Sequence, residues 1–160
     1  MQNTFGEQGE TFLQAAEFRN QPEKALREVA QMVFVCPAAA WCELMLRQKR
    51  SQKRYLYIFD RIIPGDDIGP AHAMEMMYVF HTLHRNWRPF EMKDYVAADR
   101  LAAYWCNFAR KGDPNGEGLP VWDSWREDSR RAMVIGETAE MKEVPVNAGA
   151  EKLTERILQS

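Results

Sequence analysis

The sequence is poor in features that direct a protein to a membrane or to nucleic acid. Its apolar stretches are interrupted well short of the ~20 residues that a membrane helix requires. The first segment has no basic region followed by an apolar one, so we expect no targeting peptide. Lys and Arg total 21 against 23 for Asp and Glu, and the net charge of −2 gives no general attraction for polyanions. We therefore predict no nucleic-acid and no membrane partner.

Cysteine is also scarce, and its pattern argues against a disulfide framework. Cys36, Cys42 and Cys106 are odd in number, and each lies within an apolar helical pattern. We predict buried, reduced thiols at all three positions. Such thiols are typical of a reducing compartment and favour the cytoplasm.

The residues that are present are enough for one ordinary soluble domain. The 160 residues are 46% hydrophobic and 28% charged, a composition that supports a core. Pro22 is suited to the first turn of a helix over about 22–34, and a second helix starts near Pro37. One side of the second helix is apolar, and its basic end is interpreted as solvated. The apolar residues are Ala40, Trp41, Leu44 and Met45, and the basic ones are Arg47, Lys49, Arg50, Lys53 and Arg54.

The clearest strand is the run YLYIF, from Tyr55 to Phe59, because its aromatic and β-branched residues suit burial on both faces of a sheet. A turn-rich loop between Pro64 and Pro70 follows it and leads to His72. A helix is then predicted from about Glu91 to Arg110, ended by Gly112. We expect its apolar side to pack on the sheet, with Met92, Val96, Leu101, Trp105 and Phe108.

The last third of the chain predicts two short strands, Ala132 to Ile135 and Met141 to Val146, and a terminal helix through Ala150, Leu153 and Ile157. The fold class is therefore α/β, rich in helices and with few strands. So small a sheet does not bury the apolar sides of several long helices. We expect part of the sheet to be missing from this chain.

Two stretches resemble the type B carboxylesterase and lipase family, which includes para-nitrobenzyl esterases and cholinesterases. GPAHAMEMMYVF, from Gly69 to Phe80, is similar to the histidine loop of that family, usually Gly-x-x-His-Gly-x-Glu before an aromatic-rich helix. AAYWCNFARKGDPNGEGLPVWDSW, from Ala102 to Trp125, resembles its Trp-x-x-Phe-Ala-x-x-Gly-Asp-Pro-Asn run. Weaker similarity extends over about residues 5–147. The resemblance implies a single domain over residues 1–160 that forms the carboxyl-terminal part of an α/β-hydrolase fold.

The chemistry of the resembling family needs a serine, a histidine and a carboxylate, and no cofactor. The serine stands on a Gly-x-Ser-x-Gly elbow, and none of the four serines of this chain lies in such a run. The acid of the family is usually Glu, but Glu7 and Glu10 have no strand before them to carry one. His72 matches the catalytic histidine. The nucleophile and the acid are therefore expected from an amino-terminal part that is absent here.

Two residues beside His72 bear on its geometry. Glu75 matches a family glutamate whose buried carboxylate helps to hold the loop by hydrogen bonds. Independently of the resemblance, an acidic residue is favoured in the first turn of a helix by the helix dipole. Ala73 stands where the family usually has glycine, so a positive φ at this position would strain the loop.

A zinc site is the alternative chemistry. His81 and His84 form a His-x-x-His pair that we expect to share one helix face. With no further ligand at suitable spacing on that face, polar surface residues are the better interpretation, and we predict no metal.

The sequence therefore leaves two functions open. The first is a carboxylic-ester hydrolase fragment that carries the triad histidine, is inactive alone and acts on a small ester only with a complementing amino-terminal esterase part. The alternative is a non-catalytic interaction module that self-associates as a homo-oligomer through an exposed strand edge and apolar helix faces.

Overall fold

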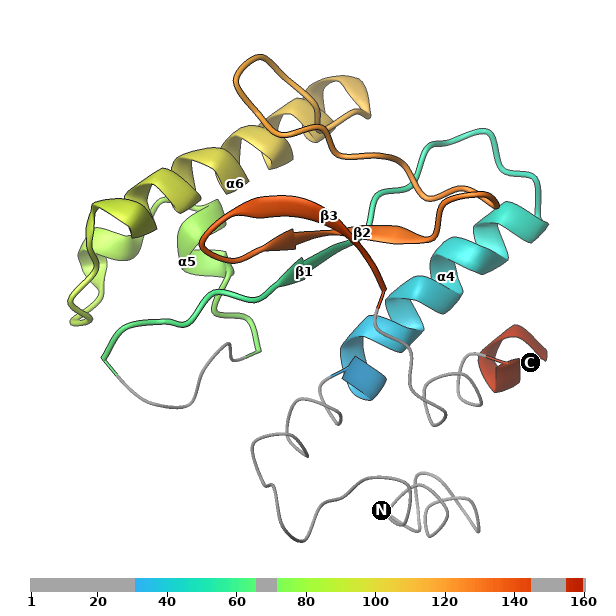
Figure 1. Cartoon of the computed structure of the whole chain (residues 1–160), viewed down its shortest axis with the longest axis horizontal. Helices are drawn as coiled ribbons and strands as arrows, with labels where there is room; N and C mark the ends of the chain where they lie inside the picture. Colours follow the sequence, from blue (N-terminus) through green and yellow to red (C-terminus); the bar gives the residue numbers. More distant parts are fainter. Residues whose placement is uncertain (1–30, 66–71, 145–154, 160) are drawn as a thin grey trace, which may run out of the picture. The chain divides into compact units, whose positions relative to one another are not determined.

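The computed structural model describes residues 31–65, 72–144 and 155–159 (Figure 1). The chain divides into two compact units, one from Ser51 to Glu143 and the other from the residues up to Arg50 and those from Val144. Most of the predicted helix over 22–34 and the start of the predicted terminal helix lie outside the described residues. Among the helices that are described, none combines the length and the hydrophobicity needed to cross a bilayer.

The first unit contains a short π-helix, η1 (Gln31–Val35), and then helix α4 (Cys36–Arg47). Pro37 lies in the first turn of α4, as predicted, and η1 runs directly into this helix. The predicted apolar side is wrong at Trp41, which is 62% exposed, whereas Ala40 is buried. The segments that pack against a helix decide which of its faces is covered, and the pattern of residues within the helix does not identify those segments. Residues 155–159 are helical in agreement with the predicted terminal helix.

The second unit is built on a three-stranded sheet in the order β1-β2-β3. Strand β1 (Tyr57–Phe59) runs parallel to β2 (Arg131–Ile135), with Tyr57 opposite Met133. Strand β3 (Ala139–Glu143) pairs antiparallel with β2 through the turn at Gly136. The predicted strands are confirmed, although β1 is shorter than expected and β3 starts before Met141 and ends at Glu143. Residues 145–146 of the predicted strand lie outside the described residues.

Helix α6 (Met92–Lys111) lies along the sheet and beside helix α5 (Met76–Val79) (Figure 1). It starts with a capping box between Glu91 and Asp94 and ends at Gly112, whose φ of +69° is the left-handed conformation that glycine adopts easily. Both ends agree with the prediction within one residue or so. The long connection through α5 and α6 is what allows β1 and β2 to run parallel.

The buried face of α6 differs from the predicted one. Leu101 is fully buried as expected, but Met92, Val96, Trp105 and Phe108 are between 43% and 77% exposed. The core instead receives a neighbouring face at helical spacing, formed by Asp94, Ala97, Ala98, Leu101 and Tyr104. Polar side chains can face the core here because they have partners, and the Tyr104 hydroxyl donates to the carbonyl oxygen of Pro120 at 2.6 Å. Cys106 lies outside this face and is exposed, contrary to the prediction.

The centre of the unit is an aromatic cluster around Trp122. The Trp122 ring meets Tyr55, Tyr57 and Tyr104 edge to face, with centroids 5.2 to 6.0 Å apart. Edge-to-face contacts are favoured because the positive ring edge meets the negative ring face. The cluster ties β1 to α6 and fixes the strand from which the histidine loop leaves.

Candidate functional site

His72 lies in a turn that directly precedes α5 and follows the loop from the carboxyl end of β1. Its side chain is exposed. In open sheets with parallel strands, sites are built on the loops that leave the carboxyl ends of the strands. β1 is parallel to β2, and His72 follows β1 in the chain, so His72 belongs to a segment that leaves the carboxyl end of a parallel strand. Its assignment as the catalytic histidine stays a prediction.

Ala73, the residue after His72, has a φ of +63°. This is the left-handed region, which costs an L-residue with a β-carbon about 1 kcal/mol relative to glycine. The turn is closed by the Met76 N–H, which donates to the carbonyl oxygen of Ala73 at 3.2 Å. We expected strain at Ala73 if its φ were positive, and the observed φ meets that condition. The resembling family has glycine at this position, which tolerates that φ without strain.

Glu75 is the N-cap residue of α5 and is half-buried. Its carboxylate acts on the hydroxyl of Tyr57 on β1. Burial, and then the charge and hydrogen bond of Glu75, raise the pKa of Tyr57 to about 12. A neutral hydroxyl that donates to a carboxylate is a strong hydrogen bond. Glu75 therefore links the start of α5 to the strand that precedes the histidine loop.

A buried ion pair joins Arg61, two residues after β1, to the first turn of α6, and the sequence did not reveal it. Arg61 and Asp94 are 3% and 0% exposed, and Arg61 Nε donates to Asp94 Oδ1 at 2.7 Å. The Tyr78 hydroxyl donates to the same oxygen at 2.9 Å. The signals available were an arginine two residues after a half-buried strand and an acidic residue in the first turn of α6. Neither signal names a partner far along the chain.

The first part of the loop is held by residues that precede α6. Arg88 Nη1 donates to the carbonyl oxygen of Pro64 at 2.9 Å. Gly65 has a φ of +98°, and a β-carbon there would lie 3.1 Å from the Trp87 ring. The backbone angle therefore favours glycine at this position, and a β-carbon would also displace the Trp87 ring. The loop is anchored before it reaches the residues that lie outside the described part.

His81 and His84 do not share a helix face, so that prediction is wrong. Helix α5 ends at Val79, His81 has a φ of +54°, and His84 belongs to the 3-10 helix η2 (Leu83–Arg85). The two histidines lie beyond the end of α5, so the spacing rule for one helix does not apply to them. His81 Nε2 instead lies 3.6 Å from Asp99 Oδ1. Across the described residues, no three His, Cys, Asp or Glu side chains gather in a way that can hold a metal ion.

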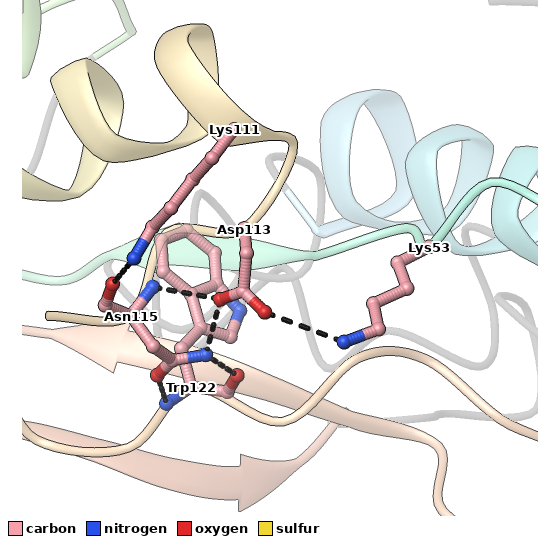
Figure 2. Close-up of polar contacts among 5 residues, drawn as sticks. All are labelled: Lys53, Lys111, Asp113, Asn115 and Trp122. Atoms are coloured by element: carbon pink, nitrogen blue, oxygen red, sulfur yellow. Dashed lines mark hydrogen bonds and ion pairs between the residues drawn. The ribbon is translucent and has the colours of Figure 1, made fainter.

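The Gly-Asp-Pro-Asn run after α6 forms a network of polar contacts (Figure 2). Asp113 accepts hydrogen bonds from the Asn115 backbone N–H at 2.9 Å and from Lys53 Nζ at 3.3 Å. Lys111 Nζ donates to the carbonyl oxygen of Asn115 at 2.6 Å. Figure 2 shows the Asn115 amide directed at the backbone of Trp122. This network of polar contacts fixes the loop that carries Trp122 into the core, so the run has a structural role in this chain.

Parts of known proteins resemble this chain in sequence and in fold. The profile of the Carboxylesterase family matches residues 8–152. Phenmedipham hydrolase from Pseudarthrobacter oxydans is 33% identical over 90 residues, which are 51% of this chain and 18% of the hydrolase. Bile salt-activated lipase from Mus musculus is 28% identical over 129 residues, which are 78% of this chain and 21% of the lipase. The chain thus spans about a fifth of the length of these curated relatives.

A solved structure gives the same result for the fold. A carboxylesterase of Geobacillus stearothermophilus, determined at pH 6.2, superposes with a TM-score of 0.58 and 28% sequence identity. The superposition covers 82% of this chain and 27% of that enzyme. The sheet and helices described above are therefore a partial α/β-hydrolase fold, helix-rich and with few strands. With the family profile matching most of its length, the chain belongs to the carboxylesterase family.

Proposed function

We propose that this chain is the carboxyl-terminal portion of a carboxylic-ester hydrolase and that His72 is the histidine of its catalytic triad. The observation that carries the proposal is the place of His72, in the turn between the loop after β1 and helix α5. Membership in the carboxylesterase family supports the same assignment. The exposed imidazole is accessible to a serine that comes from another part of the enzyme.

In the proposed reaction, His72 takes the proton of a serine hydroxyl as the serine attacks the ester carbonyl, and it returns a proton to the leaving alcohol. A carboxylate orients the imidazole and stabilises its cation. Ser51, Ser124, Ser129 and Ser160 all lie outside a Gly-x-Ser-x-Gly run. We therefore propose that a complementing portion supplies the serine, the oxyanion hole and the acid, and that the 160 residues alone are inactive.

The edge of the sheet supports the need for a complementing portion. Within the described residues, β1 pairs on one side with β2. The Leu56 carbonyl and the Asp60 N–H form hydrogen bonds with β2. Because successive residues of a strand direct their backbone polar groups to opposite edges, the N–H and C=O groups of Tyr57 and Phe59 face the other edge. Further strands of a parallel sheet would satisfy these groups. The exposed apolar residues of α6 likewise offer a surface to additional structure.

Ester hydrolysis by the isolated chain tests the second half of the proposal. The purified chain is incubated with a short-chain nitrophenyl ester, and release of nitrophenol is followed over several turnovers. We expect a rate equal to that of the His72→Ala variant, because no activated serine is present. A sustained rate that disappears in the His72→Ala variant contradicts the proposed inactivity.

A chimera tests the role of His72. The chain replaces the matching segment of the Geobacillus stearothermophilus carboxylesterase, and ester hydrolysis is measured. We expect His72→Ala to lower kcat by roughly 10³-fold or more, as removal of a triad member does. His84→Ala is the matched control, since it removes another exposed histidine outside the loop. Equal activity of the His72→Ala and His84→Ala chimeras refutes the assignment.

A second candidate is a self-associating module without catalysis. The observation in its favour is the same strand edge, because two copies can pair their β1 edges and bury the exposed apolar residues of α6. This candidate expects a concentration-dependent dimer or larger species in light scattering. A compact monomer at all concentrations speaks against it.

A further inference from the structure

Both ends of the segment that carries His72 meet on one buried carboxylate oxygen. Arg61 precedes the histidine loop, and Tyr78 follows it on α5. Arg61 Nε donates to Asp94 Oδ1 at 2.7 Å, and the Tyr78 hydroxyl donates to the same Oδ1 at 2.9 Å. The other carboxylate oxygen, Oδ2, accepts the N–H of Glu91 at 2.9 Å. Asp94 therefore fixes the entry and the exit of the loop at a single point.

The environment of Asp94 makes this point rigid. Arg61, Tyr78 and Asp94 are each at most 3% exposed, so water does not replace a lost partner. Burial raises the pKa of Asp94, but the hydrogen bonds from Arg61, Glu91 and Tyr78 outweigh it and hold the pKa below its ordinary value. The carboxylate is therefore charged, and a buried charge requires its partners. Asp94 lies in the first turn of α6, and the other residues on the same face of this helix are buried in the core.

We propose that Asp94 is a positioning residue for His72, which sets the orientation of the turn from His72 to Glu75 by holding Arg61 and Tyr78 against the start of α6. The proposal rests on the function proposed for His72 and adds the device that places the imidazole. The position of a catalytic base strongly affects the rate of the catalysed reaction, because small displacements lengthen the hydrogen bond through which the proton moves.

The alternative is that the three residues stabilise the core without any effect on His72. The geometry distinguishes the two ideas, because Tyr78 is joined to the turn that contains His72 by a short stretch of chain. The Tyr78 N–H donates to the Glu75 carbonyl oxygen at 3.0 Å, and the Val79 N–H donates to the same oxygen at 2.9 Å. A displaced Tyr78 therefore moves the last residue of the turn.

The experiment compares two tyrosine variants of the full chain. Tyr78→Phe removes one hydrogen bond to Asp94 and leaves the ring in place. Tyr104→Phe is the matched control, because Tyr104 is also fully buried and also makes one hydroxyl hydrogen bond, to Pro120, away from the histidine loop. The chain has three histidines, so the imidazole signals in NMR spectra are assigned by replacing each with alanine in turn.

We expect Tyr78→Phe to shift the His72 imidazole signals and to raise hydrogen exchange of the Tyr78 and Val79 amides by roughly 10- to 100-fold, the loss that corresponds to one hydrogen bond to a charged group. Tyr104→Phe is expected to leave both quantities unchanged after correction for its unfolding free energy. His72 signals and amide exchange that are unchanged in Tyr78→Phe, or changed equally in both variants, overturn the proposal. These readings need no esterase activity, so they stand whether or not the function proposed for His72 holds.

Kinetics then separates positioning from substrate binding. In the chimera described above, Tyr78→Phe is expected to lower kcat by about tenfold with KM unchanged, since the hydrogen bond acts on the base and not on the ester. Tyr104→Phe is expected to leave kcat in place. A change in KM alone, or an equal loss of kcat in both variants, contradicts a positioning role for Asp94 while leaving the result of the His72→Ala test untouched.

Discussion

The side-chain amide of Asn115 pairs with the backbone of Trp122 as a strand would. Asn115 Oδ1 accepts the Trp122 N–H at 2.7 Å, and Asn115 Nδ2 donates to the Trp122 carbonyl oxygen at 2.9 Å. The same Nδ2 donates to Asp113 Oδ1 at 2.8 Å. One side chain thus satisfies both polar backbone groups of a residue whose ring lies at the centre of the core.

Asn115→Ala is expected to lower the free energy of unfolding by on the order of 2 kcal/mol, because it leaves the backbone N–H and C=O of Trp122 without their partner. Urea unfolding measures the change. Asn107→Ala is the control, since Asn107 makes one hydrogen bond, from Nδ2 to the Pro114 carbonyl oxygen at 3.1 Å, and a loss of about 1 kcal/mol or less is expected there. Equal losses in the two variants contradict the special role of the Asn115 pair.

Ala73→Gly is expected to raise the unfolding free energy slightly or leave it unchanged. Relief of the left-handed φ of +63° gains about 1 kcal/mol, and the greater freedom of glycine in the unfolded chain costs about 0.5 to 1 kcal/mol. Ala103→Gly in the interior of α6 has no strain to relieve, and we expect it to lose about 1 kcal/mol. Thermal or urea unfolding compares them. If Ala73→Gly costs as much as Ala103→Gly, the strain at Ala73 is absent.

Acid unfolding is expected to depend on Asp113. Hydrogen bonds from the Asn115 backbone first, and also from the side chains of Asn115, Lys53 and Tyr55, lower the pKa of Asp113 to about 2. A carboxyl group whose pKa is lower in the folded than in the unfolded chain stabilises the fold above about pH 4, its unfolded value, and loses that effect as the pH falls through the folded value. The stability of Asp113→Asn should therefore fall less steeply between pH 4 and pH 2. Parallel pH profiles for the two proteins disprove this contribution.

Thiol labelling distinguishes the three cysteines. Cys106 is exposed, whereas Cys36 and Cys42 are buried, and burial raises the pKa of the Cys36 thiol. Because the thiolate is the reactive form, an aromatic disulfide reagent should modify one thiol rapidly in the folded chain and all three after denaturation. In Cys106→Ser the rapid phase should vanish. A rapid phase that persists in this variant shows that a buried thiol is accessible.

The sequence by itself determined the elements with strong local signals. Pro37 and Gly112 placed the start of α4 and the end of α6, because the missing N–H of proline and the free φ of glycine act within one turn of the chain. The aromatic and β-branched run that contains β1 identified the strand before His72. The motif around His72 identified the family, since specific residues at fixed spacing are visible without any fold.

Only the tertiary structure decided which groups meet. The choice of the Leu101 face of α6 over the Trp105 face, and the exposure of Cys106, follow from what packs against the helix. The separation of His81 from the axis of α5 depends on a left-handed residue that no spacing rule contains. Above all, Arg61, Tyr78 and Asp94 are far apart in the sequence and converge in the core. Buried polar groups must find partners there, and the folded chain alone defines which partners lie within reach.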